Sequence, residues 1–194
     1  MTRSLKQQRV CSYFVQSAKE IILLEGVEGV SVRKVAECAG YTFSTIYKYF
    51  RDLEALLREV KAVMIQDLFA DMQNAMPAKL LELDDIKRLN RFYAAYYLER
   101  PHVFQFFYSF RLQPEETPTV DLPNFTDVWQ MTYQGFVQSG RISAEALPRI
   151  SKIIIYTLHG LLALYFADYG ITKDALFTEL DETVDYLLGE RTSL

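Results

Sequence analysis

The chain has 194 residues, half of them hydrophobic, and a net charge of −4 at pH 7. This length and composition are typical of a globular protein with one or two domains and exclude a disordered or fibrous chain. Only eight glycines and six prolines occur, which favours long helices over a turn-rich β fold. The uncharged run Ile153–Ala167 is shorter than the roughly 20 apolar residues of a membrane span, and we interpret it as a buried interface helix.

Two features of the chain concern its compartment. The basic residues Arg3, Lys6 and Arg9 are not followed by an apolar run, so no signal peptide is expected. Cys11 and Cys38 lack a CxxC spacing and are interpreted as reduced thiols rather than a disulfide. These features predict a cytoplasmic protein without a membrane partner.

Charge is distributed unevenly along the chain. Residues 1–61 contain ten Lys/Arg and seven Asp/Glu, whereas residues 62–194 contain eleven and eighteen. A weakly basic N-terminal part could meet phosphates in spite of the negative total, although a difference this small often arises by chance.

Apolar residues recur at helical spacing in the N-terminal part. Ser31, Thr42 and Asp52 stand where N-caps are expected, and Gly26 and Gly40 stand where helices should end. The predicted helices cover residues 4–25, 32–39, 43–49 and 53–76.

The C-terminal part also has helical periodicity. Residues 113–123 contain three prolines and three acidic residues and are predicted to form an exposed loop. No segment alternates like a strand, so the fold class is predicted to be all-α. The predicted helices cover residues 83–99, 101–112, 124–139, 144–169 and 173–188.

Residues 31–50 have the pattern of a helix-turn-helix: two short helices separated by a tight turn at Gly40. Ile46 and Phe50, four residues apart, are expected to hold the second helix on the core. Small apolar residues of the first helix would let the two helices approach closely: Val35, Ala36 and Ala39.

Residues 14–57 resemble the TetR family of regulators. The resemblance includes Ser31-Val32, Val35-Ala36, Ala39-Gly40, Thr45-Ile46-Tyr47, Tyr49-Phe50 and Leu56-Leu57. It implies a three-helix DNA-binding domain at residues 1–51 and a helical ligand-binding and dimerisation domain at residues 52–194. It also implies a homodimer that binds a roughly palindromic double-stranded DNA operator and is usually released by a small-molecule effector.

The resemblance assigns roles to the recognition segment. Lys48 is expected to contact the groove or a phosphate, although it could be a solvated surface lysine, and Arg33 to meet a backbone phosphate. The predicted DNA-binding set is Arg33, Thr42, Phe43, Ser44, Thr45, Tyr47, Lys48, Tyr49 and Arg51.

This chain departs from the family pattern at Tyr41, Phe43, Ser44 and Leu53. Two of these positions, 43 and 53, commonly carry a cation in the family, so Arg51 and the N-terminal basic residues are candidates to replace them. Phe43 could contact a thymine methyl group or only pack locally.

The C-terminal part is rich in aromatic residues, which either fill a core or line a cavity for a flat, hydrophobic effector. The predicted ligand-binding residues are Phe92, Tyr96, Phe104, Phe107, Trp129 and Tyr133. The last two helices either close the monomer core or form a dimer interface across a two-fold axis. The predicted interface residues are Gly160, Ala163, Ala167, Leu176, Leu180 and Val184.

No motif for a catalytic centre, a metal site or a cofactor occurs in the sequence. His102 and His159 are isolated from cysteine and acidic partners, so neither is expected to bind metal. We therefore expect no enzyme and no cofactor, but a ligand-responsive transcriptional regulator, most simply a repressor. The alternatives are an all-α carrier or enzyme with an aromatic pocket, or a sensor without DNA binding.

Overall fold

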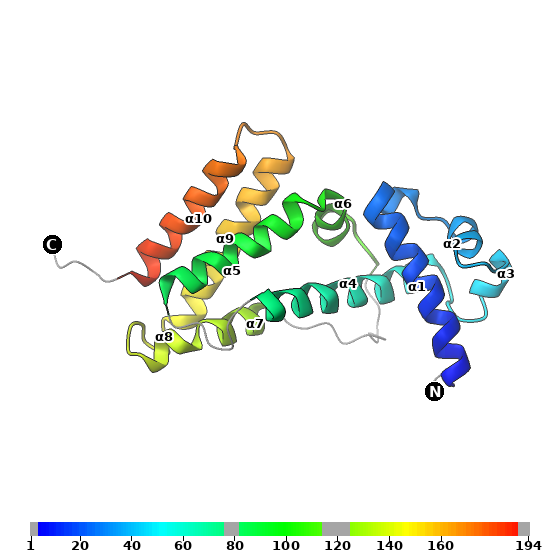
Figure 1. The fold of residues 1–194 in the computed structure, drawn as a ribbon, viewed down its shortest axis with the longest axis horizontal. Helices are drawn as coiled ribbons and strands as arrows, with labels where there is room; N and C mark the ends of the chain where they lie inside the picture. The colour runs from blue at the N-terminus through cyan, green and yellow to red at the C-terminus, as the bar shows by residue number, and fades with distance from the viewer. Residues whose placement is uncertain (1–3, 76–81, 114–124, 190–194) are drawn as a thin grey trace. The chain divides into compact units, whose positions relative to one another are not determined.

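The computed structural model describes residues 4–75, 82–113 and 125–189, with the side chains of all but residues 125–128. Every regular element within these residues is helical, which confirms the all-α prediction (Figure 1). Residues separate into two compact units. The first comprises residues 1–68 with 100–122, and the second comprises residues 69–99 with 123–194.

Helix α1, Leu5–Glu25, begins at a capping box. The Ser4 hydroxyl accepts from the backbone N–H of Gln7 at 3.3 Å, and the Gln7 side chain accepts from the N–H of Ser4 at 2.9 Å. The helix buries one stripe of side chains, and its C-terminal cap is Gly26 at φ +85°. Local residues therefore set both ends of the helix, and the end at Gly26 is as predicted.

The next elements are short: the 3₁₀ turn η1, Val27–Gly29; α2, Val32–Cys38; and α3, Phe43–Ile46. The Ser31 hydroxyl caps α2 by accepting from the N–H of Lys34 at 3.2 Å. Helix α2 packs on both α1 and α3. Figure 1 shows these three helices grouped together.

Helix α4, Leu53–Ala75, is the longest element of the chain that the structure describes. Asp52 caps it, because its Oδ1 accepts from the N–H of Ala55 at 2.8 Å. That backbone bond, followed by the neighbouring Arg51, lowers the pKa of the Asp52 carboxyl.

The predicted helix over residues 101–112 is wrong beyond Phe104. Helix α6 spans only Pro101–Phe104 and continues as a π-helix, η2, over Gln105–Ser109. The chain is extended at Phe110, where φ is −82° and ψ is 126°. Phe104, Phe106 and Phe107 are all buried.

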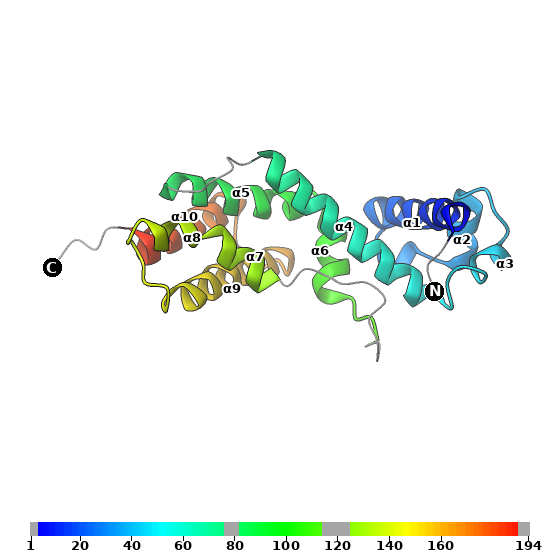
Figure 2. The ribbon, with the colours of Figure 1, turned by 90° about the horizontal axis from the view of Figure 1, so that it is seen from below.

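The second unit contains α5, Leu83–Leu98; α7, Phe125–Thr132; α8, Gln134–Gln138; α9, Leu147–Phe166; and α10, Lys173–Leu188. Helix α10 packs on α9 and α5, and α7 packs on α9. Figures 1 and 2 both show α9 and α10 side by side. The helix predicted over residues 124–139 is divided at Tyr133, where ψ is 3°.

Ion pairs join α5 to α10 at the edge of this packing. The Arg91 guanidinium forms a fork on Asp181, with the shortest nitrogen–oxygen distance at 2.7 Å. Lys87 Nζ lies 2.6 Å from Asp185. Arg91 and Asp185 are largely exposed, so we expect these pairs to orient α10 more than to stabilise it.

Helix α9 is long and apolar enough to cross a membrane by length and composition alone. One third of its most apolar segment is buried inside the protein. Its exposed apolar side chains include Ile153, Tyr156 and Leu164. A soluble helix with one face in the core and another against a partner has the same composition, so this observation is weak evidence for a membrane span.

Candidate nucleic-acid interface and ligand site

The turn of the helix-turn-helix depends on Gly40, whose φ is +75°. Such a backbone favours glycine because a side chain is strained there. The turn is closed by the N–H of Gly40 on the carbonyl of Glu37 at 3.0 Å and the N–H of Tyr41 on Ala36 at 2.8 Å. Helix α3 ends earlier than the predicted Tyr49, and residues 47–49 continue as turns.

An aromatic cluster holds the recognition segment on the core. Ile46 and Phe50 are buried, as predicted, and the ring of Phe50 lies 6.4 Å from that of Phe14, centre to centre. The ring of Phe14 lies 5.2 Å from that of Tyr41 and 6.1 Å from that of Tyr49. Tyr49 is half-buried, so it supports the segment from the inside as well as offering its edge to solvent. Tyr41, which departs from the family pattern, also packs against Phe14 in this cluster.

The outer face of the segment is exposed. Phe43 and Tyr47 keep 56% and 55% of their surfaces in solvent, so both side chains are accessible to a partner. Thr42, Ser44 and Lys48 are exposed, and Thr45 is half-buried.

Thr42 occupies the N-cap position of α3 without the predicted side-chain cap. Its hydroxyl instead contacts the hydroxyls of Ser44 at 3.1 Å and Thr45 at 2.9 Å. Three neighbouring hydroxyls are thus ordered on one surface. Groups of this kind donate to phosphate oxygens in protein–DNA interfaces.

The cations around this surface differ in their surroundings. Arg33, on the first turn of α2, and Lys48 are exposed. Arg51 Nε donates to Asp52 Oδ2 at 2.7 Å, so a phosphate would compete with this carboxylate. Among the N-terminal basic residues, Lys6 and Arg9 are exposed, and Arg3 lies outside the described residues.

Residues 14–60 match the family model of the bacterial regulatory proteins, tetR family. The match includes both short helices and the exposed face just described. The N-terminal helix-turn-helix is therefore of the TetR type. The chain is a DNA-binding transcriptional regulator with its helix-turn-helix at the N-terminal end. No curated protein matched its sequence.

Several solved structures share the fold. RolR in complex with resorcinol has 16% identity and a TM-score of 0.68, covering 97% of this chain and 92% of RolR. A protein of unknown function from Rhodococcus sp. RHA1 has 20% identity and a TM-score of 0.71, covering 93% and 96%. A tetR-family regulator from Streptomyces coelicolor has 16% identity and a TM-score of 0.67, covering 93% and 80%. At these identities the likeness concerns the fold.

The predicted ligand-binding residues of the regulator fall into both units. Phe104 and Phe107 belong to the first unit, and the other four belong to the second. Within the second unit Trp129 lies 5.9 Å from Tyr133, ring to ring, and both are buried. Tyr96 is buried and Phe92 is half-buried.

Trp129 and Tyr133 belong to a buried polar cluster that sequence reasoning missed in part. Trp129 lies 5.4 Å from the ring of Tyr93 on α5. The Tyr133 hydroxyl donates to Asn90 Oδ1 at 3.4 Å. The Tyr93 hydroxyl contacts His159 Nε2 at 3.1 Å. A signal was available, because residues 90, 93 and 97 share one face of a helix.

Burial determines the protonation of this cluster. His159 Nδ1 donates to the carbonyl of Ile155 at 2.8 Å, which leaves Nε2 to accept from Tyr93. Desolvation lowers the pKa of His159, partly opposed by that backbone bond. Desolvation also raises the pKa of Tyr133. At neutral pH the cluster therefore carries neutral imidazole and phenol groups.

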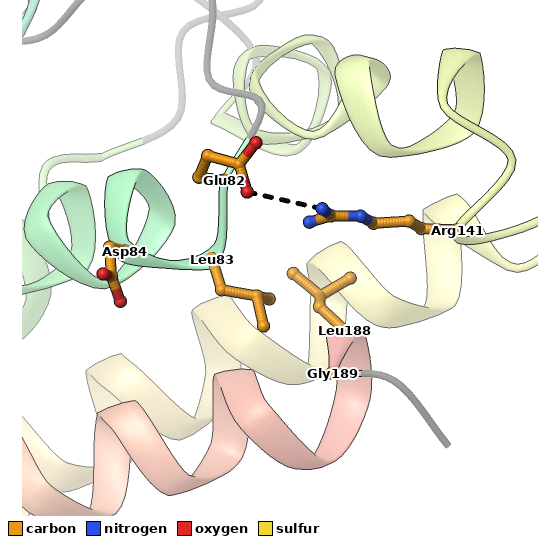
Figure 3. Close-up of a pocket in the computed structure, with 6 residues that line it drawn as sticks. All are labelled: Glu82, Leu83, Asp84, Arg141, Leu188 and Gly189. Atoms are coloured by element: carbon orange, nitrogen blue, oxygen red, sulfur yellow. Dashed lines mark hydrogen bonds and ion pairs between the residues drawn. The ribbon is translucent and has the colours of Figure 1, made fainter. Parts of the chain in front are cut away.

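Two surface pockets of about 420 Å³ each lie in the second unit. One is lined by Glu82, Leu83, Asp84, Arg141, Leu188 and Gly189 (Figure 3). Arg141 faces Glu82 across it, with a nitrogen–oxygen distance of 3.3 Å. The other is lined by Gln130, Met131, Gln134 and Leu147. Neither lining includes a predicted ligand-binding residue.

The residues predicted for the dimer interface fall into an exposed group and a buried group. Gly160 and Ala163 are exposed on α9, and Ala167 is exposed at its C-cap. Leu176, Leu180 and Val184 of α10 are at most 1% exposed and help to close the core of their own unit. The apolar stripe of α10 therefore packs inside the monomer. Of the residues predicted for the dimer interface, only those of α9 and its C-cap are accessible to a second chain.

Proposed function

We propose that the regulator represses transcription from a short, roughly palindromic operator and that a small hydrophobic or aromatic effector releases it. The observation that carries the proposal is the exposed face of α3 and the following turns, held from below by Ile46 and Phe50. RolR, which shares the fold, is known in complex with the aromatic molecule resorcinol. We infer a cytoplasmic location from the same function.

In the proposed complex, the domain at residues 1–51 meets the major groove. Lys48 contacts a base edge or phosphate, and Phe43 meets a thymine methyl. Arg33 and the hydroxyl groups contact phosphates. The full proposed set is Arg33, Thr42, Phe43, Ser44, Thr45, Tyr47, Lys48, Tyr49 and Arg51.

A homodimer would supply the second recognition helix that a split operator needs. The exposed apolar face of α9 supports this assembly, because Ile153, Tyr156 and Leu164 accompany the small residues Gly160 and Ala163 there. Small residues allow a second helix to pack closely.

The variant Ala163→Glu tests the dimer. It places a charge on an exposed position of α9 and should yield folded monomers with weakened operator binding. Ala144→Glu, at another exposed position, should remain dimeric. A dimeric Ala163→Glu protein would contradict this interface, as analytical ultracentrifugation would reveal.

The proposed coupling runs through α4. An effector bound in the domain at residues 52–194 would bias the tilt of this helix and change the separation of the two recognition helices in the dimer. Half-sites lie about 34 Å apart, so a shift of a few ångströms would prevent simultaneous docking. This requires that the effector bind one of two states more tightly.

Operator binding is the primary test. DNA fragments are selected from a random pool, and affinity is measured by fluorescence anisotropy at two salt concentrations. Lys48→Ala should weaken binding and lower the salt slope by about one unit per protomer. Arg149→Ala, which removes an exposed cation from α9, is the matched control. Failure of wild type to bind any fragment above the non-specific level would favour a carrier or enzyme without DNA binding.

A further inference from the structure

Asn90 is buried and only half-satisfied. Its side chain is 0% exposed. Oδ1 accepts from the Tyr133 hydroxyl at 3.4 Å, whereas Nδ2 has no hydrogen-bond partner among the residues whose side chains the structure describes. Turning the amide over exchanges these atoms and leaves the oxygen unpaired instead. Buried polar groups are nearly always paired, so in either orientation Asn90 can form one more hydrogen bond.

The groups around Asn90 are aromatic. Tyr133 and Trp129 lie with ring centres 5.9 Å apart, and the rings of Trp129 and Tyr93 are 5.4 Å apart at 72°. Both distances fall in the range of favourable ring contacts. These rings come from α5, α7 and the start of α8, and they are almost completely buried. Their faces and edges would pack against a flat apolar body.

The same surroundings disfavour a charged ligand. Tyr93 and Tyr97 are joined by their hydroxyls at 3.4 Å, and Tyr93 continues to His159. His159 is neutral at pH 7, because desolvation lowers its pKa, and its Nδ1 donates to the carbonyl of Ile155. A carboxylate or ammonium group beside Asn90 would therefore be buried without a counter-charge from Tyr93, Tyr97 or His159, which is costly.

We infer, on the basis of the proposed function, that the effector is an uncharged aromatic molecule whose hydroxyl group pairs with the Asn90 amide. A hydroxyl donates and accepts, so it satisfies Asn90 in both orientations. The aromatic body packs against Trp129 and Tyr133. Since these rings are buried, they must shift to admit it.

Trp129 is the only tryptophan of the chain, so its fluorescence reports this site directly. The purified full chain is titrated without DNA using two sets of probes: phenol, toluene and benzoate; and 4-phenylphenol, 4-methylbiphenyl and biphenyl-4-carboxylate. We expect the hydroxyl member of at least one set to quench Trp129 with a Kd at least tenfold lower than its methyl and carboxylate counterparts. Equal or tighter binding of a counterpart, or no binding by either set, would overturn the inference.

Asn90→Leu tests the residue itself. It should abolish the preference for the hydroxyl probe. It removes the unpaired amide but also takes the acceptor from the buried Tyr133 hydroxyl, so the Tm of the ligand-free protein should fall only modestly. A lower Tm with an unchanged preference would assign Asn90 a purely structural role. Asn74→Leu, at an exposed position of α4, should alter neither quantity.

Tyr133→Phe provides a second variant should Asn90→Leu fail to fold. It keeps the ring and removes the hydroxyl that holds Asn90, so the preference for the hydroxyl probe should fall by about tenfold. An unchanged preference would count against the inference.

Operator release by the same probes separates this inference from the proposed function. A hydroxyl probe that binds near Trp129 without releasing DNA would contradict the regulatory function alone. Release by a carboxylate or methyl probe, but not by its hydroxyl counterpart, would contradict the inferred effector class alone.

Discussion

Lys61 Nζ on α4 donates a hydrogen bond to the carbonyl oxygen of Phe107 in the π-helix, over 2.9 Å. The ammonium group also lies 5.5 Å from the centre of the Phe107 ring and 5.9 Å from that of Phe106. A charged group surrounded by aromatic rings interacts favourably with them but loses hydration. Burial accordingly lowers the pKa of Lys61.

This lowered pKa predicts an alkaline contribution to stability. The unfolded chain retains a proton on Lys61 at pH values where the folded chain has released it, so stability rises with pH between the folded pKa and 10.5. Lys61→Met removes the titrating group and keeps the apolar stem. The free energy of unfolding of wild type minus that of the variant, measured in urea from pH 7.5 to 10.5, should increase. A constant difference would show that Lys61 titrates normally.

The lowered pKa of His159 predicts that stability also depends on pH in the acidic range. Desolvation lowers its pKa below 6.5, so the unfolded chain binds the proton first as the pH falls. Stability should decline from pH 6.5 downward until the folded pKa is passed. His159→Gln should lack this component in urea unfolding measured from pH 7.5 to 4.5. An identical acid profile for both proteins would refute the assignment.

Phe43 distinguishes DNA contact from local packing. Because more than half of its surface is exposed, Phe43→Ala should change the free energy of unfolding by less than about 0.5 kcal/mol. It should weaken specific operator binding by about 1 kcal/mol through loss of an apolar contact in the groove. Phe43→Leu should retain part of that affinity. A large loss of stability with unchanged affinity would support the packing role.

Gly40 should be sensitive to substitution for backbone reasons alone. An added Cβ would meet nothing within 4 Å, but φ is +75°. Gly40→Ala should therefore destabilise the chain by about 1 kcal/mol, measured by urea unfolding. Gly40→Asn should cost less, because asparagine tolerates this conformation better. Equal effects of Ala and Asn would point to another cause.

The helix boundaries that depend on neighbouring residues could be predicted from the sequence. Ser4, Ser31 and Asp52 cap helices within their own few residues, so the sequence nearby is sufficient. The interruption after Phe104 and the division at Tyr133 depend on which rings enter the core. Which rings are buried depends on packing against segments distant in sequence, and the periodicity of a single segment does not predict that packing.

The sites were predictable to different extents. The recognition segment is contiguous, so its exposed face could be listed before the structure was known. The role of Asn90 could not be predicted from the residues near it, because its hydrogen-bond partner Tyr133 lies 43 positions away in the sequence. A stripe such as Leu176, Leu180 and Val184 has the same spacing whether it packs inside one chain or between two, and only the burial of these residues within the monomer distinguishes the alternatives.

The small number of cations on the recognition surface has a physiological consequence. Arg33 and Lys48 are exposed and form no ion pair with the residues that the structure describes. If both contact phosphate in each protomer of the proposed dimer, these four contacts imply a salt slope of about −3.6. Affinity would then fall about 150-fold between 50 and 200 mM salt, against roughly 10³–10⁵ for six to ten contacts. On the proposed function, the regulator should therefore lose less operator affinity than a protein with six to ten phosphate contacts when osmotic stress raises the salt concentration in the cell.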